Sequence, residues 1–74
     1  SVMAEAPGMD VTVVIPAYKR PDALAKAVRS VLEQDHDPAR YEVIVVDSSP
    51  TDENVRLVED MIPQAKCSLR VIHK

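Results

Sequence analysis

Short apolar runs alternate along the chain with longer stretches in which apolar residues recur at helical spacing. Residues 11–15 are rich in β-branched side chains and stop at Pro16, which predicts a short strand. Four consecutive apolar residues within 42–47 predict a second strand that is buried on both faces, as in a parallel sheet. Residues 69–72 are typical of a third strand.

Between these strands the spacing predicts two amphipathic helices. Pro21 suits the first position of one helix, whose apolar stripe continues to about Gln34. The other helix is expected to start at a serine cap, Ser49, and to end before Pro63. Its apolar face is expected to consist of Val55, Val58, Met61 and Ile62.

The order β-α-β-α-β predicts an α/β fold, a Rossmann-like half with a parallel three-stranded sheet. Crossovers between parallel strands are right-handed, so strands added in one direction place both helices on one face of the sheet. The first two strands are nevertheless apolar on both faces. We therefore expect the other face to be covered, either by a missing C-terminal half of the protein or by self-association.

Composition narrows the range of partners. The chain has 74 residues, enough for one domain, and a net charge of −3, which argues against nucleic acid or an anionic membrane as a partner. No apolar run approaches the roughly 20 residues of a membrane span.

Residues 1–10 lack a signal-peptide pattern and are expected to be a disordered lead-in to a domain at 11–74. A cytoplasmic chain is expected, with membrane association of its parent left open.

Candidate chemistry gathers after the first two strands, because ligands bind at the carboxyl ends of parallel strands. Tyr18 can stack on a base, and Asp47 can accept a hydrogen bond from a ribose hydroxyl or a base N–H. Ser48 and Ser49 can add hydroxyls, and Arg20 belongs to the same candidate site. Plain structural interpretations stay open: a packing role for Tyr18, a turn or cap for Asp47, a solvated Arg20 and a helix cap for Ser49.

Other kinds of site find little support in the sequence. The single glycine, Gly8, precedes the first strand, so both the dinucleotide fingerprint and the P-loop are absent. The Asp-His-Asp sequence at 35–37 is interpreted as a solvated turn, because adjacent side chains point in different directions. Cys67 is interpreted as an inert thiol, and His73 has no acid or nucleophile beside it in a recognisable arrangement.

Four segments in this order resemble the opening of a family 2 glycosyltransferase: VTVVIPAYKRP at 11–21, AVRSVLEQ at 27–34, YEVIVVD at 41–47 and SPTD at 49–52. The resemblance implies the N-terminal, nucleotide-sugar-binding part of a GT-A fold. It places Pro16, Ala17 and Tyr18 in the base and ribose pocket. Asp47 matches the first acid of the family's Asp-Asp pair and Ser48 replaces the second, so UDP, TDP and GDP all stay open as donor nucleotides.

The resemblance also implies what lies outside these residues. The family's Asp-x-Asp metal motif and its catalytic base come later in the sequence, so no catalytic residue and no metal ligand is assigned here. The parent enzyme is expected to invert configuration with Mg²⁺ or Mn²⁺, and this chain alone to be inactive. Two alternatives stay open, a non-enzymatic βαβ module that self-associates and an unrelated α/β regulatory domain.

Overall fold

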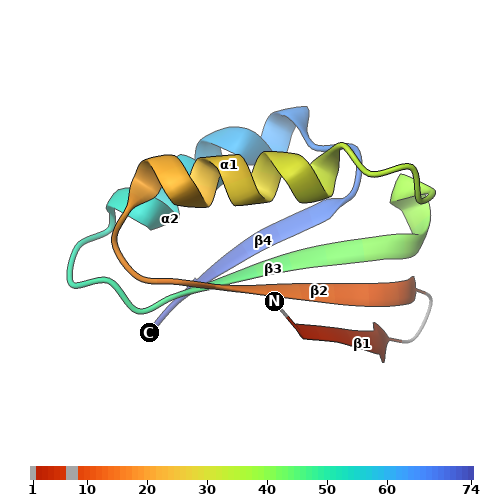
Figure 1. Ribbon diagram of the computed structural model, residues 1–74, viewed down its shortest axis with the longest axis horizontal. Helices are drawn as coiled ribbons and strands as arrows, with labels where there is room; N and C mark the ends of the chain where they lie inside the picture. The colour runs from red at the N-terminus through yellow and green to blue at the C-terminus, as the bar shows by residue number, and fades with distance from the viewer. Residues whose placement is uncertain (1, 7–8) are drawn as a thin grey trace.

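The computed structural model describes residues 2–6 and 9–74, which form one four-stranded sheet and two α-helices (Figure 1). The first half contains β1 and β2, followed by the longer helix α1. The second half contains β3, α2 and β4, with a short 3₁₀ turn before β3 and another after α2. In chain order the elements are β1 (Val2–Ala6), β2 (Met9–Ala17), α1 (Pro21–Leu32), η1 (Pro38–Arg40), β3 (Tyr41–Asp47), α2 (Glu53–Met61), η2 (Ile62–Gln64) and β4 (Ser68–His73).

The sheet has the strand order β1-β2-β3-β4, and its last three strands are parallel. This confirms the predicted α/β class with a three-stranded parallel sheet, an arrangement consistent with a Rossmann-like half of a GT-A fold. The register places Ala17 beside Asp47, and Asp47 beside His73. The carboxyl ends of the three parallel strands therefore meet along one edge of the sheet.

The N-terminal segment differs from the expected disordered lead-in over residues 1–10. Val2–Ala6 forms β1, which pairs antiparallel with β2, and β2 itself begins at Met9 rather than Val11. The strand β1 was not predicted because Val2–Ala6 contains a single β-branched residue and no strand-like apolar run. Residues 1, 7 and 8 lie outside the described residues. The domain limits of 11–74 stay a prediction.

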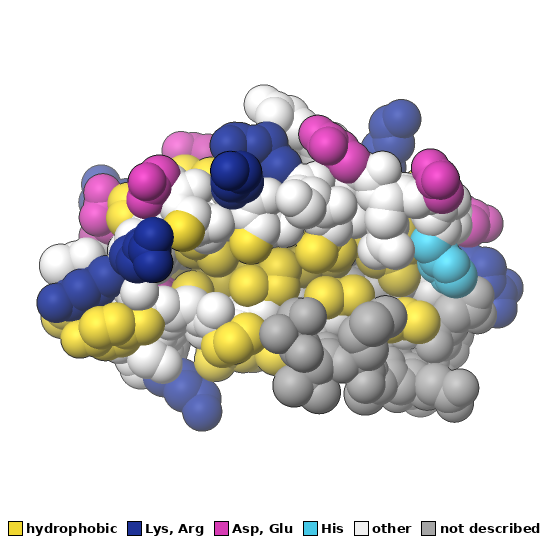
Figure 2. Space-filling view, viewed as in Figure 1, with side chains coloured by type: hydrophobic (Ala, Val, Ile, Leu, Met, Phe, Trp, Pro, Cys, Tyr) yellow, Lys and Arg dark blue, Asp and Glu magenta, His cyan; other side chains and the backbone are white. Residues whose placement is uncertain are grey.

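Both helices lie on the same face of the sheet, as the handedness of the crossovers predicts (Figure 1). The core between them and the sheet contains Val28, Val43, Val45 and Val58, all fully buried. Figure 2 shows a band of hydrophobic side chains below α1 and charged side chains spread over the helices. Complete burial of such a side chain contributes roughly 1.5–3 kcal/mol.

The start and the buried face of α2 differ from the sequence prediction. The helix begins at Glu53, with Asp52 as its N-cap residue, and not after a cap at Ser49. Its buried face has helical spacing but includes a polar side chain, because Asn54 is only 1% exposed. The residues on this face are Asn54, Leu57, Val58 and Met61. Ile62, which was expected on it, is 39% exposed.

The second face of the sheet is not covered by either helix (Figure 1). Side chains along β3 alternate between fully buried and half-buried, and Ile44 and Val46 are half-buried on the side away from the helices. Ile72 on β4 is 42% exposed. An ion pair crosses the same face, with Arg70 Nε 3.4 Å from Glu42 Oε2. Among the described residues, this face therefore combines apolar side chains with an ion pair at its surface, of a kind that contributes little stability.

Candidate functional site

The two loops singled out in the sequence lie side by side at the carboxyl edge of the sheet. Ala17 ends β2 directly beside Asp47, the last residue of β3. The Ser48 N–H then donates a hydrogen bond to the Ala17 carbonyl at 2.9 Å, which extends the contact one residue beyond the strand. Parallel pairing thus brings together residues that are 30 positions apart, so the two halves of the candidate site converge as expected.

Asp47 is the buried centre of this edge and has no exposed surface. Its Oδ1 accepts hydrogen bonds from the Ser49 hydroxyl at 2.7 Å and from the Ser49 N–H at 3.3 Å. The Asn54 side-chain amide donates to the same oxygen at 3.1 Å. These donors satisfy one carboxylate oxygen, whereas Oδ2 has no hydrogen-bond partner in the described part of the chain.

These hydrogen bonds fix the charge of Asp47. Burial by itself raises the pKa of the carboxyl, because it disfavours the ionised form. The donors on Ser49 and Asn54, together with the charge of the nearby His73 imidazole, outweigh burial and hold the pKa of Asp47 below its ordinary value. The edge of the sheet therefore carries a buried carboxylate that stays negative at neutral pH.

Ser49 joins the two loops instead of capping α2. Its hydroxyl donates to Asp47 and accepts a hydrogen bond from the Lys19 N–H at 2.6 Å. Asn54 makes a second link, donating to the Lys19 carbonyl at 3.0 Å. The helix-cap interpretation of Ser49 is therefore wrong. Asn54 was not predicted as a site residue, since a polar residue in the first turn of a helix is usually solvated.

The turn between β2 and α1 has an unusual backbone. Lys19 and Arg20 both have positive φ angles, 53° and 52°, although neither is glycine. Such conformations cost roughly 1–3 kcal/mol each and persist where surrounding contacts impose them. Here the imposing contacts are two hydrogen bonds of the Lys19 backbone, whose N–H donates to the Ser49 hydroxyl and whose carbonyl accepts from the Asn54 amide.

Replacing Lys19 should therefore stabilise the protein. We expect Lys19→Gly or Lys19→Asn to raise the free energy of unfolding by about 1 kcal/mol, because both residues tolerate positive φ better than lysine. Urea denaturation measures the change, and Lys26→Gly in the exposed middle of α1 is the matched control, expected to destabilise by about 1 kcal/mol. A loss of stability in Lys19→Gly would contradict the assignment of strain to this turn.

The other predicted site residues surround Asp47 at the surface. Tyr18 is 61% exposed, so the packing interpretation of this side chain is not supported. The Lys19 ammonium lies 5.4 Å from the centre of its ring, a cation–π contact. Pro16, Arg20 and Ser48 are exposed as well. Two hollows flank the turn, one of about 270 Å³ beside Ser49 and Asn54 and one of about 200 Å³ beneath Tyr18.

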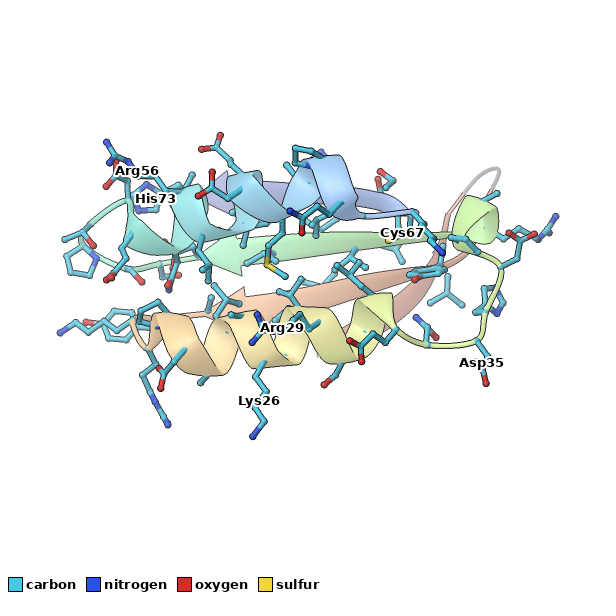
Figure 3. The ribbon with its side chains drawn as sticks, turned by 90° about the horizontal axis from the view of Figure 1, so that it is seen from above. Lys26, Arg29, Asp35, Arg56, Cys67 and His73 are labelled. Atoms are coloured by element: carbon cyan, nitrogen blue, oxygen red, sulfur yellow. The ribbon has the colours of Figure 1, made fainter. Side chains whose placement is uncertain are left out.

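His73 completes this edge, although the sequence analysis found no acid beside it. Its Nε2 lies 3.6 Å from Asp47 Oδ2 and 2.9 Å from the Ser49 carbonyl oxygen. Figure 3 shows His73 at the end of β4, on the opposite side of the molecule from Asp35 and Cys67. The sheet register was the missing information, because it alone places position 73 beside position 47.

The opposite end of the molecule holds none of the predicted site residues. A cavity of about 580 Å³ lies there between the ends of the two helices and is lined in part by Leu32, Tyr41 and Met61. The Asp-His-Asp sequence at 35–37 is exposed there. Across residues 2–6 and 9–74 no group of three or more His, Cys, Asp or Glu side chains is placed to hold a metal ion.

Residues 12–74 match the model of glycosyl transferase family 2. The chain belongs to glycosyltransferase family 2. A search of curated proteins and a search of solved structures each found no significant match. The matched residues include both loops of the candidate site, β3, β4 and β2 from Thr12 onwards. Membership of glycosyltransferase family 2 implies, in general, a nucleotide-sugar donor.

For this glycosyltransferase family 2 chain, two further points follow from the described residues. Neither of the helices found in 2–6 and 9–74 has both the length and the apolar composition needed to cross a bilayer. For the divalent metal that the family resemblance implies, these residues provide no group of three or more His, Cys, Asp or Glu side chains. No chemical step is therefore assigned to a metal at this edge of the sheet.

Proposed function

We propose that this chain binds the nucleoside part of a nucleotide-sugar donor for an inverting glycosyltransferase, and that these residues alone do not transfer the sugar. The observation that carries the proposal is the placement of an exposed aromatic ring, Tyr18, and a buried carboxylate, Asp47, at the carboxyl ends of two paired strands. Parallel α/β sheets bind ligands at this edge. Family membership supplies the donor class.

The residues have different roles in this proposal. The Tyr18 ring stacks on the base, with Pro16 and Ala17 lining the shallow hollow beside it. Asp47 Oδ2, which has no protein hydrogen-bond partner among the described residues, accepts from a base N–H or a ribose hydroxyl. Because Oδ2 is buried, a small movement of the atoms that cover it must accompany ligand entry.

Charged and hydroxyl groups at the surface complete the donor site. The Arg20 side chain is exposed and carries a positive charge that complements the donor diphosphate. Ser48 is exposed and offers a neutral hydroxyl, which can donate or accept a hydrogen bond. A hydroxyl at this position is compatible with UDP, TDP or GDP, because each of their bases presents both a ring N–H and a carbonyl oxygen. Ser49 contributes indirectly, by orienting Asp47.

Transfer requires groups that this edge does not contain. A Mg²⁺ or Mn²⁺ ion would offset the charge of the leaving diphosphate, and a general base would activate the acceptor hydroxyl. The metal stays part of the proposal for the parent enzyme and is assigned to no described residue. The chain's own contribution is to bind and orient the donor.

Titration of the chain with UDP, TDP and GDP, followed by amide chemical shifts, tests the proposal. We expect one of them to shift the amides around Tyr18 and Asp47, and not those lining the cavity at the opposite end. Tyr18→Ala should weaken binding about 5- to 150-fold, since base stacking contributes roughly 1–3 kcal/mol. Tyr18→Phe is the matched control and should bind nearly as well as the wild type. Absence of shifts at this edge with all three nucleotides would refute the proposal.

A further inference from the structure

His73 and Asp47 are neighbours because of the parallel register between β3 and β4. The two residues are paired across these strands, so their side chains project from the same face at the same level. The next residue keeps this alignment, since the Lys74 N–H donates to the Asp47 carbonyl at 2.8 Å. The contact is therefore set by backbone pairing and does not depend on a chance rotamer of an exposed side chain.

The surroundings of the ring determine where its proton lies. Nε2 faces two groups, the Ser49 carbonyl at 2.9 Å and Asp47 Oδ2 at 3.6 Å, and both can only accept. Nε2 must therefore carry a hydrogen, and the neutral ring is the tautomer protonated at Nε2. That hydrogen goes to the carbonyl, because 3.6 Å is too long for a hydrogen bond. Asp47 Oδ2 is left as a buried acceptor without a donor.

We propose that His73 is a positioning residue of the nucleoside pocket. Its Nε2–H holds the Ser49 carbonyl, and this fixes the loop whose hydroxyl and N–H orient Asp47 through Oδ1. The carboxylate is thereby held with Oδ2 towards His73, buried and without a hydrogen donor until a donor group of the ligand enters. The ring is 38% exposed, so it can shift as that group enters. The inference rests on the proposed function, since it assigns His73 a role in the same pocket.

Substitutions at position 73 separate positioning from a merely structural role. His73→Ala removes the donor to Ser49, and we expect it to weaken binding of the preferred nucleotide among UDP, TDP and GDP about tenfold. His73→Gln keeps an N–H donor on a side chain of similar reach and should retain affinity within about threefold of the wild type. His36→Ala, at the other end of the molecule, is the matched control and should leave affinity unchanged.

Two spectra report on His73 without any ligand. Long-range ¹H–¹⁵N correlations of the ring in its neutral form should show a protonated Nε2 and a bare Nδ1. The carbonyl carbon of Ser49 should shift in His73→Ala and keep its position in His36→Ala. A ring protonated at Nδ1, or an unmoved Ser49 carbonyl, would overturn the assignment of His73.

The binding data and the spectra together distinguish failure of the proposed function from failure of the role assigned to His73. If the wild type binds none of the three nucleotides, the proposed function fails, and the spectra alone then decide whether His73 holds Ser49. If the wild type binds but the Ala and Gln variants lose affinity equally, the donor at position 73 is not what matters and the positioning role is refuted. Unchanged affinity in His73→Ala would refute it as well.

Discussion

Asp47→Ala should lower the free energy of unfolding by about 3 kcal/mol, because it leaves the buried donors of Ser49 and Asn54 without their acceptor. For a domain of 74 residues the whole stability is roughly 4–11 kcal/mol, so this loss is a large part of it. Urea denaturation measures the change. Asp52→Ala is the matched control, since Asp52 is exposed and its ion pair with Arg56 contributes at most about 1 kcal/mol.

The same substitution should change how stability depends on pH. The folded-state pKa of Asp47 lies below the unfolded value of about 3.9, so its contribution is present above that pH and is lost as pH falls through the folded pKa. Asp47→Ala should therefore lose less stability than the wild type over this acidic range. A variant within 1 kcal/mol of the wild type at neutral pH, with an unchanged acid transition, would contradict the role assigned to the carboxylate.

Asn54→Asp should be more damaging still, at about 4 kcal/mol near neutral pH. The amide donates to Asp47 Oδ1 at 3.1 Å, so the substitution places a second carboxylate against the first within a buried site. Like charges at this separation raise the folded-state pKa of the introduced carboxyl above its unfolded value. Its proton is therefore bound more tightly in the folded state, and stability should be recovered as pH falls.

The pH dependence distinguishes charge repulsion from a simple loss of hydrogen bonds. Asn54→Leu removes the same donors without adding charge, and we expect it to cost about 2 kcal/mol without the recovery in acid. Urea denaturation of both variants between about pH 4 and pH 8 gives the comparison. If Asn54→Asp were as stable as Asn54→Leu at every pH, the two carboxylates would not share one buried site.

The parallel sheet and the first helix were predictable from the sequence, because the apolar runs and the helical spacing between them both indicate a parallel α/β fold. Continuous apolar residues in β3 indicated a buried parallel strand, and Pro21 marked the start of α1 correctly. The start of α2 was predicted too early because Ser49 followed by Pro50 has the composition of a cap. Capping is a local preference, and here the buried Asp47 carboxylate takes the serine hydroxyl instead. A tertiary contact of this kind leaves no local pattern.

The location of the candidate site was predictable from the sequence, but two of the residues that form it were not. Strand ends indicated where Tyr18 and Asp47 would lie, since both follow predicted strands. Asn54 and His73 reach the same edge from α2 and β4, and only the packing of α2 and the register of β4 reveal this. The assignment of these residues to nucleotide binding stays a prediction.

Ala17, Asp47 and His73 lie side by side on three neighbouring strands. The number of residues in the segments that connect these strands therefore determines whether the site forms. Side chains alternate between the two faces of a sheet, so deleting one residue from the link between η2 and β4 would turn the histidine to the uncovered face. Both the histidine and the aspartate would still be present in the sequence, but the imidazole would no longer lie beside the carboxylate. A sequence alignment that allows a one-residue gap in this link can therefore match every residue of the edge and still describe a protein that lacks it.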